Sequence, residues 1–427
     1  MNTTENTAEK NTAATPAFDI VIVGAGSGGI SAASSLLKRN RGFRIALIDP
    51  ATEHYYQPGW TMVGGGIFGA KTTRRQMQDL IPSDASWIKQ AVKGFKPSEN
   101  EVVLMDGSSV AYKHLIVAPG LTLDWDGIDG LKESLGKNGV TSNYSYDLAP
   151  YTWDLVTGLK GGKALFTQPP MPIKCAGAPQ KALYLSCDNW LRHKVLNDIE
   201  VDFMNAGGVL FGVSEYVPAL QSYIDRYGVN VNYFHNLEAV DGKKKVAHFK
   251  IVSGEKEGEQ IVKPFDMIHV CPPQRAPDFV ANSELAGPGG WLEVDQFSLR
   301  HTRFDNVWGL GDVMNTPNAK TMAAVRKQVP VVAENIVAAL KGESLRAGYD
   351  GYGSCPLTVE RGKIVLAEFG YGGKLIPTFP KWVLEGTEPT KAAWMLKKGI
   401  LPGIYWNAML KGREWMAGPA DLEKLRA

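Results

Sequence analysis

Two runs of apolar residues, with a glycine turn and a helical pattern of small and apolar residues between them, predict a βαβ unit near residue 18. From Phe18 to Asp49 the order is an apolar strand (FDIVIVG), a glycine turn, a helix of small residues (ISAASSLLKR) and a second strand (RIALID). Residues 101–120 predict two more strands, EVVLM and YKHLIVAPG, joined by the turn signal Asp106-Gly107. This alternation favours the α/β class.

A second α/β block follows the first. Its predicted strands are KALFTQ, VDFMNA and VNVNYF, and its predicted helices lie near residues 178–193 and 214–227. FDMIHVCPP looks like a buried strand ended by two prolines. NVWGLGD predicts one more buried strand, and a helix follows from about Lys320 to Lys341. The last 80 residues differ, because they are rich in glycine, proline, aromatic residues and lysine.

Composition places the chain among globular proteins. Its 427 residues, 44% of them hydrophobic and 21% charged, suffice for two or three domains with large cores. A formal net charge of +2 gives no reason to expect a nucleic-acid partner. The chain holds no run of about 18 uncharged apolar residues, so we expect no transmembrane helix. Residues 1–17 are polar and lack the apolar segment of a secretory signal, so we expect a disordered tail there.

The first glycine turn carries the pattern of a dinucleotide site. Gly24, Gly26 and Gly29 satisfy G-x-G-x-x-G between a predicted strand and a predicted helix. Gly24 permits the tight turn, Gly26 lets the backbone approach a pyrophosphate, and Gly29 allows close packing of helix on strand. Asp49 ends the next strand, where a carboxylate would accept hydrogen bonds from a ribose. The helix N-terminus would bind the phosphates.

Two further motifs favour FAD over NAD. Thr302-x4-Val-Trp-Gly-Leu-Gly311-Asp312 resembles the second FAD fingerprint of flavoproteins with two dinucleotide-binding domains. The strand that ends in Ala118-Pro119-Gly120 resembles the motif that crosses between their domains. The helix near Lys320 would direct its positive end, and that ammonium, at the flavin. In the second block, KALFTQ runs into a proline-rich turn without a glycine pair, which argues against a nicotinamide site.

Four cysteines are too few for a disulfide-framed secreted protein. Cys175 follows Lys174 at a strand-to-helix turn, where a nearby cation and a helix N-terminus would lower the pKa of the thiol. Cys355 lies on a second loop. We expect Cys187, within a helix, and Cys271, at a strand end, to be packed in the core. Four cysteines allow three pairings, so composition alone does not choose among them.

At this point the chain resembles the type II sulfide:quinone oxidoreductases. The matching stretches are IVIVGAGSGGI, HYYQPGWTMVGGG, PIKCAGAPQKALYLS, NVWGLGD, NAKTMAAV, YDGYGSCPL and LAEFGYGGK. In this family two cysteines flank the flavin and form a redox-active disulfide, and the motifs place them at Cys175 and Cys355. Type I relatives carry another redox cysteine earlier in the chain. No cysteine precedes Cys175 here, which favours the two-cysteine type.

The resemblance implies a mechanism and its partners. Hydrogen sulfide would attack the disulfide, leaving a persulfide on Cys355 and a thiolate on Cys175. Two electrons would pass to non-covalent FAD and then to a ubiquinone-type quinone, with Lys320 as the candidate to hold a flavin oxygen or a quinone carbonyl. The sulfur acceptor stays open between a thiol, sulfite and sulfide. No metal is expected, and a homo-oligomer is one of the states considered.

The C-terminal segment has the composition of an interfacial anchor. AAWMLKKGILPGIYWNAMLKG predicts two short amphipathic helices broken at Pro402-Gly403, with lysines at the rim. Phe379 and Trp382 are candidate contacts of the quinone ring. The alternatives are a dimer interface or a helix pair that covers the FAD domain. An anchor implies a peripheral membrane protein on the cytoplasmic face of the inner membrane, or on the matrix side if the protein is mitochondrial. The tryptophans of this segment are Trp382, Trp394, Trp406 and Trp415.

Together these patterns predict two tandem Rossmann-like domains and a C-terminal amphipathic region that associates with a membrane. The expected division is residues 1–17 as a disordered tail, 18–125 with 297–345 as a discontinuous FAD-binding domain, 126–296 as a second Rossmann-like domain without an NAD fingerprint, and 346–427 as the cysteine, quinone and membrane region. Competing interpretations are a type II NADH:quinone dehydrogenase, a flavocytochrome sulfide dehydrogenase subunit and a flavin/cysteine redox sensor.

Overall fold

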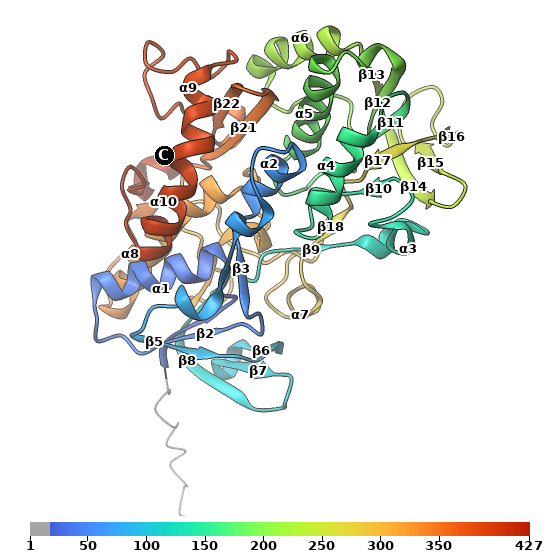
Figure 1. Ribbon diagram of the computed structural model, residues 1–427. Helices are drawn as coiled ribbons and strands as arrows, with labels where there is room; N and C mark the ends of the chain where they lie inside the picture. The colour runs from blue at the N-terminus through green and yellow to red at the C-terminus, as the bar shows by residue number, and fades with distance from the viewer. Residues whose placement is uncertain (1–17) are drawn as a thin grey trace, which may run out of the picture.

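Two α/β lobes lie side by side in the computed structural model, which describes residues 18–427 (Figure 1). The predicted disordered tail, residues 1–17, lies outside the described residues. The chain crosses from the first lobe to the second at β9 (Thr122–Leu123) and returns at β18 (Gln274–Arg275). These two short strands pair antiparallel, so both crossings lie at one place between the lobes.

The sheet of the first lobe confirms the predicted βαβ unit and the α/β class. Its order is β5-β2-β1-β8-β7-β6, with β19 added beside β8. Strands β5, β2, β1, β8 and β19 run parallel, whereas β6 and β7 complete an antiparallel edge. Helices α1 and α8 pack against each other on this lobe. The bounds are β1 (Phe18–Val23), α1 (Ser27–Arg39), β2 (Ile45–Ile48), β5 (Ala85–Ile88), β6 (Val92–Lys96), β7 (Glu101–Leu104), β8 (Ser109–Val117), β19 (Val307–Gly309) and α8 (Met322–Leu340).

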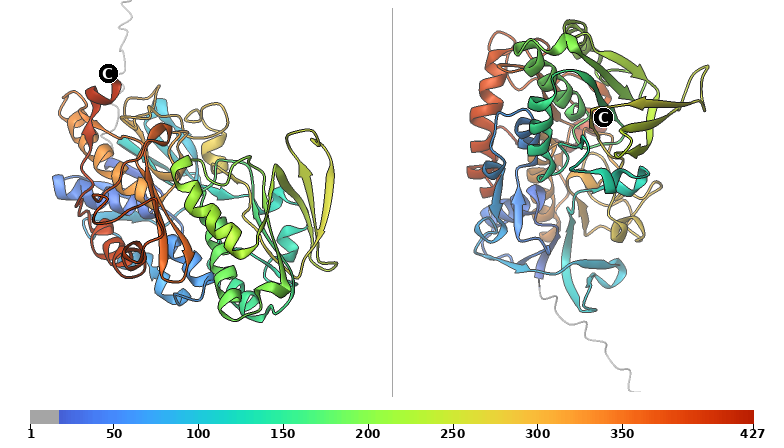
Figure 2. Two further views of the ribbon diagram at one scale, coloured as in Figure 1. Left: turned by 90° about the horizontal axis from the view of Figure 1, so that it is seen from above. Right: turned by 45° about the vertical axis from the view of Figure 1, so that its right-hand side comes forward.

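The second lobe holds a five-stranded parallel sheet of order β10-β17-β11-β12-β13. An antiparallel sheet, β14-β15-β16, projects from it (Figure 2). The bounds are β10 (Val140–Thr141), α4 (Leu148–Gly158), β11 (Gly162–Gln168), α5 (Ala178–Arg192), β12 (Ile199–Asn205), α6 (Val217–Tyr227), β13 (Asn230–Tyr233), β14 (His235–Asp241), β15 (Val246–Ile251), β16 (Gln260–Pro264) and β17 (Met267–His269).

The core of the first lobe extends to residues that precede β19. Val280, Leu285 and Leu292 are fully buried with the side chains of β1 and β8. Each buried side chain of this size contributes roughly 1.5–3 kcal/mol to the free energy of unfolding. The chain therefore returns to the first lobe at β18. The sequence analysis places this return later, at residue 297.

The C-terminal region adds a hairpin, which packs on α5 of the second lobe, and a helical run, whose residues Tyr405 and Trp406 join the core of the first lobe (Figure 1). The hairpin consists of β21 (Gly353–Glu360) and β22 (Lys363–Phe369). The prediction of two helices broken at Pro402-Gly403 is wrong. Instead α9 (Lys391–Met395), a π-helical turn (Leu396–Ile400) and α10 (Leu401–Asn407) follow without a gap. Pro402 lies in the first turn of α10, where a missing N–H costs little.

Shorter elements complete the described part of the chain. Strand β20 pairs antiparallel with β23, which ties the two ends of the C-terminal region together. No helix within residues 18–427 has the length and apolar character needed to cross a membrane. The remaining bounds are β3 (Glu53–Tyr55), α2 (Trp60–Gly64), β4 (Arg74–Gln76), α3 (Leu131–Ser134), α7 (Asp278–Ala281), β20 (Ala347–Gly348), β23 (Ala420–Asp421) and α11 (Leu422–Arg426).

Candidate active site

The glycine loop between β1 and α1 has the geometry that the sequence predicts. Gly24 has a φ of +96°, and a Cβ there would lie 2.4 Å from the Ala118 carbonyl oxygen. A Cβ on Gly29 would lie 1.8 Å from the Gly24 carbonyl oxygen. Only glycine fits at these two positions. At Gly26, by contrast, a Cβ would meet nothing within 4 Å, so the loop is open on the side from which a ligand approaches.

These residues fit a dinucleotide cofactor. Helix α1 has Gly26 as its N-cap, without a side-chain cap or an acidic residue in its first turn, so its positive end stays available to a phosphate. Asp49 is half-buried, and its carboxylate accepts hydrogen bonds from the Ala25 N–H at 2.7 Å and the Ala51 N–H at 2.8 Å. Asp49 therefore fastens the loop, in addition to the ribose contact that the sequence predicts.

The second predicted FAD motif lies next to the glycine loop, since a Cβ on Gly24 would lie 2.8 Å from the Pro119 Cα and one on Gly28 would lie 3.1 Å from the Leu310 Cδ2. Pro119 and Gly120 follow β8, and Gly311 and Asp312 follow the neighbouring β19. Gly120 and Gly311 both have positive φ, at +77° and +80°. The carboxyl ends of parallel strands meet at one sheet edge, where ligands bind in open α/β sheets.

Lys320 is buried beside this motif. Its ammonium donates to the Asp312 carbonyl at 2.8 Å and to the Met314 carbonyl at 2.7 Å, and lies 4.2 Å from the centre of the Trp291 ring. Burial lowers the pKa of Lys320 to about 8, although the charge of Asp312 opposes this. Helix α8 begins two residues later, capped by the Thr321 hydroxyl, which accepts from the Ala324 N–H.

The two cysteines of the matched motifs come together although they are 180 residues apart. Their Sγ atoms lie 3.4 Å from each other, and both thiols are free. Cys355 is on strand β21, not on the loop that the sequence predicts, and is 2% exposed. A Cβ on Gly177 would lie 2.6 Å from the Cys355 Sγ, so a glycine there makes room for the pair. The Cys175 N–H donates to the Lys320 carbonyl at 2.8 Å, which joins the cysteine turn to the first lobe.

Cys175 adopts a strained backbone. Its φ of +52° lies in the left-handed region, which non-glycine residues rarely occupy. Such strain costs about 1–3 kcal/mol and concentrates at functional sites, where the surrounding structure enforces it. Here the Lys320 carbonyl and the start of α5 hold the turn, because the Ala178 N–H donates to the Cys175 carbonyl at 2.7 Å.

Two buried lysines next to this pair were not predicted. The Lys181 ammonium donates to the Cys175 Sγ at 2.9 Å. A hydrogen bond from Cys355, together with the charge of Lys181, holds the pKa of the Cys175 thiol well below its usual range, against the effect of burial. The Cys355 thiol, which donates to Cys175 and is buried, has a raised pKa.

Lys397, the second buried lysine, comes from the π-helical turn. Its ammonium donates to the Pro356 carbonyl at 3.2 Å and approaches the Thr358 hydroxyl at 3.4 Å. Burial, and then the charge of Lys181, lower the pKa of Lys397 to about 7. Lys181 lies six residues after Cys175 in the same matched motif, and this proximity in sequence is only a weak signal of contact. No pattern in the sequence connects Lys397 with the cysteines.

Lys174, the cation that the sequence places next to Cys175, is directed elsewhere. Its ammonium donates to the Gln57 side chain at 2.7 Å and lies 5.6 Å from the Trp60 ring. The sequence predicts that this adjacent lysine lowers the pKa of the Cys175 thiol, whereas in the structure Lys181 is the lysine that donates to the sulfur. The other two cysteines are in the core, and burial raises the pKa of both Cys187 and Cys271.

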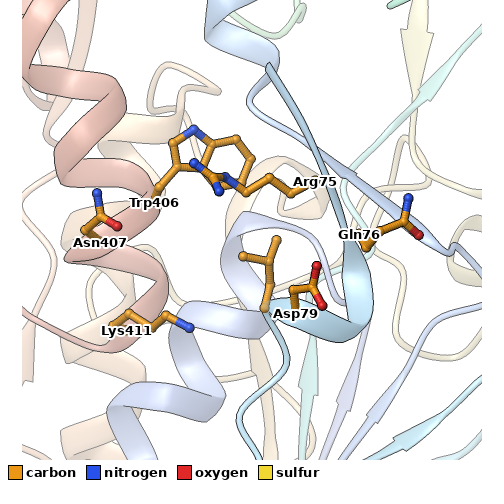
Figure 3. A pocket seen from close by; sticks show the side chains of 7 residues that line it. Arg75, Gln76, Asp79, Trp406, Asn407 and Lys411 are labelled. Carbon is orange, nitrogen blue, oxygen red and sulfur yellow. The ribbon is translucent and has the colours of Figure 1, made fainter. Parts of the chain in front are cut away.

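The C-terminal helix reaches the glycine loop. The Tyr405 hydroxyl, on α10, lies 2.7 Å from the Ser27 Oγ and 2.5 Å from the His54 Nε2. The neighbouring Trp406 is also buried, and the Arg75 guanidinium lies 4.6 Å from the centre of its ring, at the edge of a surface hollow (Figure 3). This part of the predicted anchor therefore covers the first lobe, as one of the alternatives proposed.

Other apolar residues of the same region face solvent. Trp382 is 87% exposed and Trp415 is 69% exposed, and Met395 and Ile400 are also exposed. Phe379 is half-buried and packs on the cluster around Ile364. The region thus combines side chains that join the core with large apolar side chains that have no cover within residues 18–427.

Comparison with known proteins first identifies the domain that contains the glycine loop. The family model of the pyridine nucleotide-disulphide oxidoreductases matches residues 18–150, which contain the glycine loop and β8. Residues 18–150 therefore form a pyridine nucleotide-disulphide oxidoreductase domain, which is the class of domain that this α/β lobe and its glycine loop define.

Curated relatives narrow the class. The mitochondrial sulfide:quinone oxidoreductase of Dictyostelium discoideum is 44% identical over 92% of this chain and 86% of its own length. That of Mus musculus is 38% identical over 96% of this chain and 89% of its own. This chain belongs to the sulfide:quinone oxidoreductase family. The crystal structure of the Aquifex aeolicus sulfide:quinone oxidoreductase has the same fold, with a TM-score of 0.74 at 16% identity over 91% of each chain.

Proposed function

We propose that this chain oxidises hydrogen sulfide to sulfane sulfur at Cys175 and Cys355, and passes the electrons through FAD to a membrane quinone. The observation that carries the proposal is the approach of the two sulfurs to 3.4 Å, beside a buried ammonium, in a member of the sulfide:quinone oxidoreductase family.

The cysteine pair performs the sulfur chemistry. In the disulfide state, hydrosulfide attacks the Cys355 sulfur, the bond between the cysteines breaks, and Cys175 leaves as a thiolate. Cys355 then carries a persulfide, whose outer sulfur passes to a thiol, sulfite or a second sulfide. Two cysteine thiolates remain, and they lose two electrons as their disulfide forms again. FAD, when bound without a covalent link, supplies the acceptor of this electron pair and later delivers it to the quinone.

The lysines favour this direction of attack. Lys181 donates to the Cys175 sulfur, so it stabilises the negative charge that develops on the leaving thiolate. A thiolate of lower pKa is the better leaving group in thiol–disulfide exchange. The pKa of the Cys355 thiol is raised, because it donates a hydrogen bond to Cys175 and is buried, so Cys355 is the poorer leaving group of the two. The asymmetry supports Cys355 as the sulfur that receives sulfide.

An anaerobic titration of the purified protein tests the proposal. Sulfide should bleach the flavin absorbance, a quinone should restore it, and NADH should have no effect. Bleaching by NADH instead would favour a type II NADH:quinone dehydrogenase, and a single reduction without turnover would favour a redox sensor. Denaturation should release the flavin intact. Cys175→Ser and Cys355→Ser should each abolish sulfide-driven reduction and retain FAD, and near-normal turnover in either variant would overturn the cysteine assignment.

We also propose that the exposed apolar side chains of residues 382–416 contact the bilayer in which the quinone dissolves. In a mitochondrion this contact would be on the matrix side of the membrane. Their exposure supports this, because large apolar residues are normally covered. Truncation after Phe379 is a poor test, since it removes Tyr405 and Trp406 from the core. The double variant Trp382→Ser with Trp415→Ser is preferable. It should lose binding to liposomes and keep its FAD, and unchanged liposome binding would contradict the proposal.

A further inference from the structure

A hollow lies on the surface between α10 and the segment around β4. It has a volume of about 240 Å³, several times the space of about 30 Å³ that one water molecule takes in the liquid. The hollow is therefore large enough for a small polar group. Two distant parts of the chain line it, with Arg75 and Asp79 on one side and Trp406 and Lys411 on the other (Figure 3).

Three charged side chains of this lining have no ion pair. Arg75, Asp79 and Lys411 are all exposed, and none of them forms a salt bridge with another residue of the described range 18–427. The neighbouring Arg74, by contrast, pairs with Glu53 at 3.1 Å. Charges of both signs thus face one hollow and stay available to a ligand.

The Arg75 guanidinium is held in place by an aromatic ring. It lies 4.6 Å from the centre of the Trp406 ring, and Trp406 is buried in the core of the first lobe (Figure 3). This contact uses the face of the guanidinium, whereas its N–H donors lie in its plane. A planar set of donors matches two oxygens of a phosphate group. Arg75 is therefore fixed with its donors unused at the edge of the hollow.

The charges of the hollow match a phosphoethanolamine headgroup. Its phosphate is an anion that Arg75 and Lys411 can bind, and its primary ammonium can donate to the Asp79 carboxylate. The side-chain amides of Gln76 and Asn407 offer further donors to the phosphate oxygens. A purely anionic headgroup would leave Asp79 beside a second negative charge. A choline headgroup has no N–H with which to donate to Asp79.

The helical run next to the hollow offers a path for the acyl chains of a lipid. Ile400, Ile404 and Asn407 follow one another at helical spacing, so they lie on one face of the run. Ile400 is 52% exposed, and Asn407 lines the hollow. An apolar surface therefore leads to the charged hollow, as a ligand with a polar head and apolar tails requires.

We propose that this hollow binds the headgroup of phosphatidylethanolamine. The proposal rests on the proposed contact of residues 382–416 with a bilayer, and it names the lipid that this contact selects. Arg75 and Lys411 bind the phosphate, and Asp79 binds the ammonium. Because a charged headgroup stays at the membrane surface, its binding fixes the depth to which the helical run enters the bilayer.

Flotation of the FAD-bound, full-length protein with vesicles tests the site. The vesicles consist of phosphatidylcholine alone, or of phosphatidylcholine mixed with an equal part of phosphatidylethanolamine or of phosphatidylglycerol. The parent should bind the phosphatidylethanolamine vesicles about five-fold more tightly than those of phosphatidylcholine, which is the effect of one charge pair at a membrane surface. Lys411→Gln should remove this preference. Asp79→Asn should also remove it, and should bind the phosphatidylglycerol vesicles more tightly than the parent does.

Lys398→Gln is the matched control. It removes the same charge from the same helical run, and Lys398 is exposed but does not line the hollow. This variant should keep the preference of the parent for phosphatidylethanolamine. All three substitutions change exposed side chains, and the flavin absorbance of each variant verifies its fold.

Two results would overturn the site alone: equal binding of the parent to phosphatidylethanolamine and phosphatidylcholine vesicles, or an unchanged preference in Lys411→Gln. If the parent shows no such preference but binds soluble phosphoethanolamine, the hollow takes a free phosphate ester and the lipid site is wrong. Absence of binding to every vesicle would overturn the proposed bilayer contact and the site with it. A failure of the proposed sulfide oxidation is distinguishable, because flavin bleaching is measured without vesicles.

Discussion

At the residue scale, the hydrogen bond between the two thiols and one neighbouring ammonium favour negative charge on the Cys175 sulfur. Lys181 donates to the Cys175 sulfur, whereas Lys397 donates to backbone and hydroxyl oxygens of the cysteine hairpin. An opposite charge at hydrogen-bond distance favours the ionised form of a thiol. The pKa values of the two thiols are thus shifted in opposite directions although both lie in one buried site.

Lys181→Met should raise the pKa of the Cys175 thiol. Loss of an adjacent cation moves the pH midpoint of alkylation of the reduced protein upward by about one to three pH units. Alkylation by iodoacetamide, followed at Cys175 by mass spectrometry across pH, measures the midpoint. Lys174→Met is the control, because the Lys174 ammonium is directed to Gln57. An unchanged midpoint in Lys181→Met would contradict the assignment.

Gly177→Ala should separate the two sulfurs. The added methyl group would lie 2.6 Å from the Cys355 Sγ and 2.3 Å from the Leu357 Cδ2, so the turn or the hairpin has to move. We expect slower disulfide formation, measured as the loss of free thiols on oxidation. Gly158→Ala, on α4 of the same lobe, meets nothing within 4 Å and should behave as the parent. A variant at Gly177 that oxidises as fast as the parent would show that the close approach is unnecessary.

At the scale of elements, the glycine loop depends on α10. The Tyr405 hydroxyl is buried between Ser27, at the start of α1, and His54. Hydrogen bonds in such a buried cluster position the backbone of the loop, since each donor and acceptor is satisfied only when the loop and the helix are both in place.

Tyr405→Phe should therefore weaken both the fold and the cofactor site. It leaves the buried partners without their hydroxyl, which costs about 1–3 kcal/mol of the free energy of unfolding. Urea unfolding measures this loss, and fluorescence titration measures the affinity for FAD, which we expect to fall. Tyr151→Phe removes a single hydrogen bond, to the Gly139 N–H, in the other lobe. It should lower stability without a change in FAD affinity, and equal losses of affinity in both variants would refute the coupling.

Elements with a local pattern were predictable from the sequence, and long-range contacts were not. The glycines of the first loop, most strands of both parallel sheets and helices α5 and α8 follow from periodicity and turn residues. Strands β5, β6 and β10 were not predicted. The sequence does not predict the return of the chain to the first lobe at β18, because no change in composition marks it. Lys397 was missed since a π-helical turn aims it at the hairpin, and Tyr405 because its partner Ser27 is 378 residues away.

At the scale of the whole molecule, stability should fall in mild acid. Burial lowers the pKa of His54, His114 and His269 to about 4 in the folded protein, from an ordinary value of 6.5. All three histidines are neutral in the folded protein. Their contribution to the free energy of unfolding is therefore complete above pH 6.5 and is lost as the pH falls toward 4. The unfolded chain binds more protons in this range.

The free energy of unfolding should fall by up to about 1.4 kcal/mol per pH unit for each of these histidines between pH 6.5 and pH 4. Urea unfolding between about pH 7 and about pH 4.5, at constant FAD, measures the slope. His269→Gln keeps an acceptor for the Asn143 N–H and should reduce the slope, because one titrating group is removed. A free energy of unfolding that stays constant over this range would show that these histidines are not held neutral.

The contact between Tyr405 and Ser27 also has a consequence for biosynthesis. Ser27 leaves the ribosome 378 residues before its partner Tyr405. The loop that would bind the cofactor phosphates thus stays incomplete until α10 has emerged and docked. Cofactor capture therefore becomes a check on full-length synthesis: chains that terminate early, even those with both α/β lobes complete, should fail to retain the flavin and remain accessible to proteases.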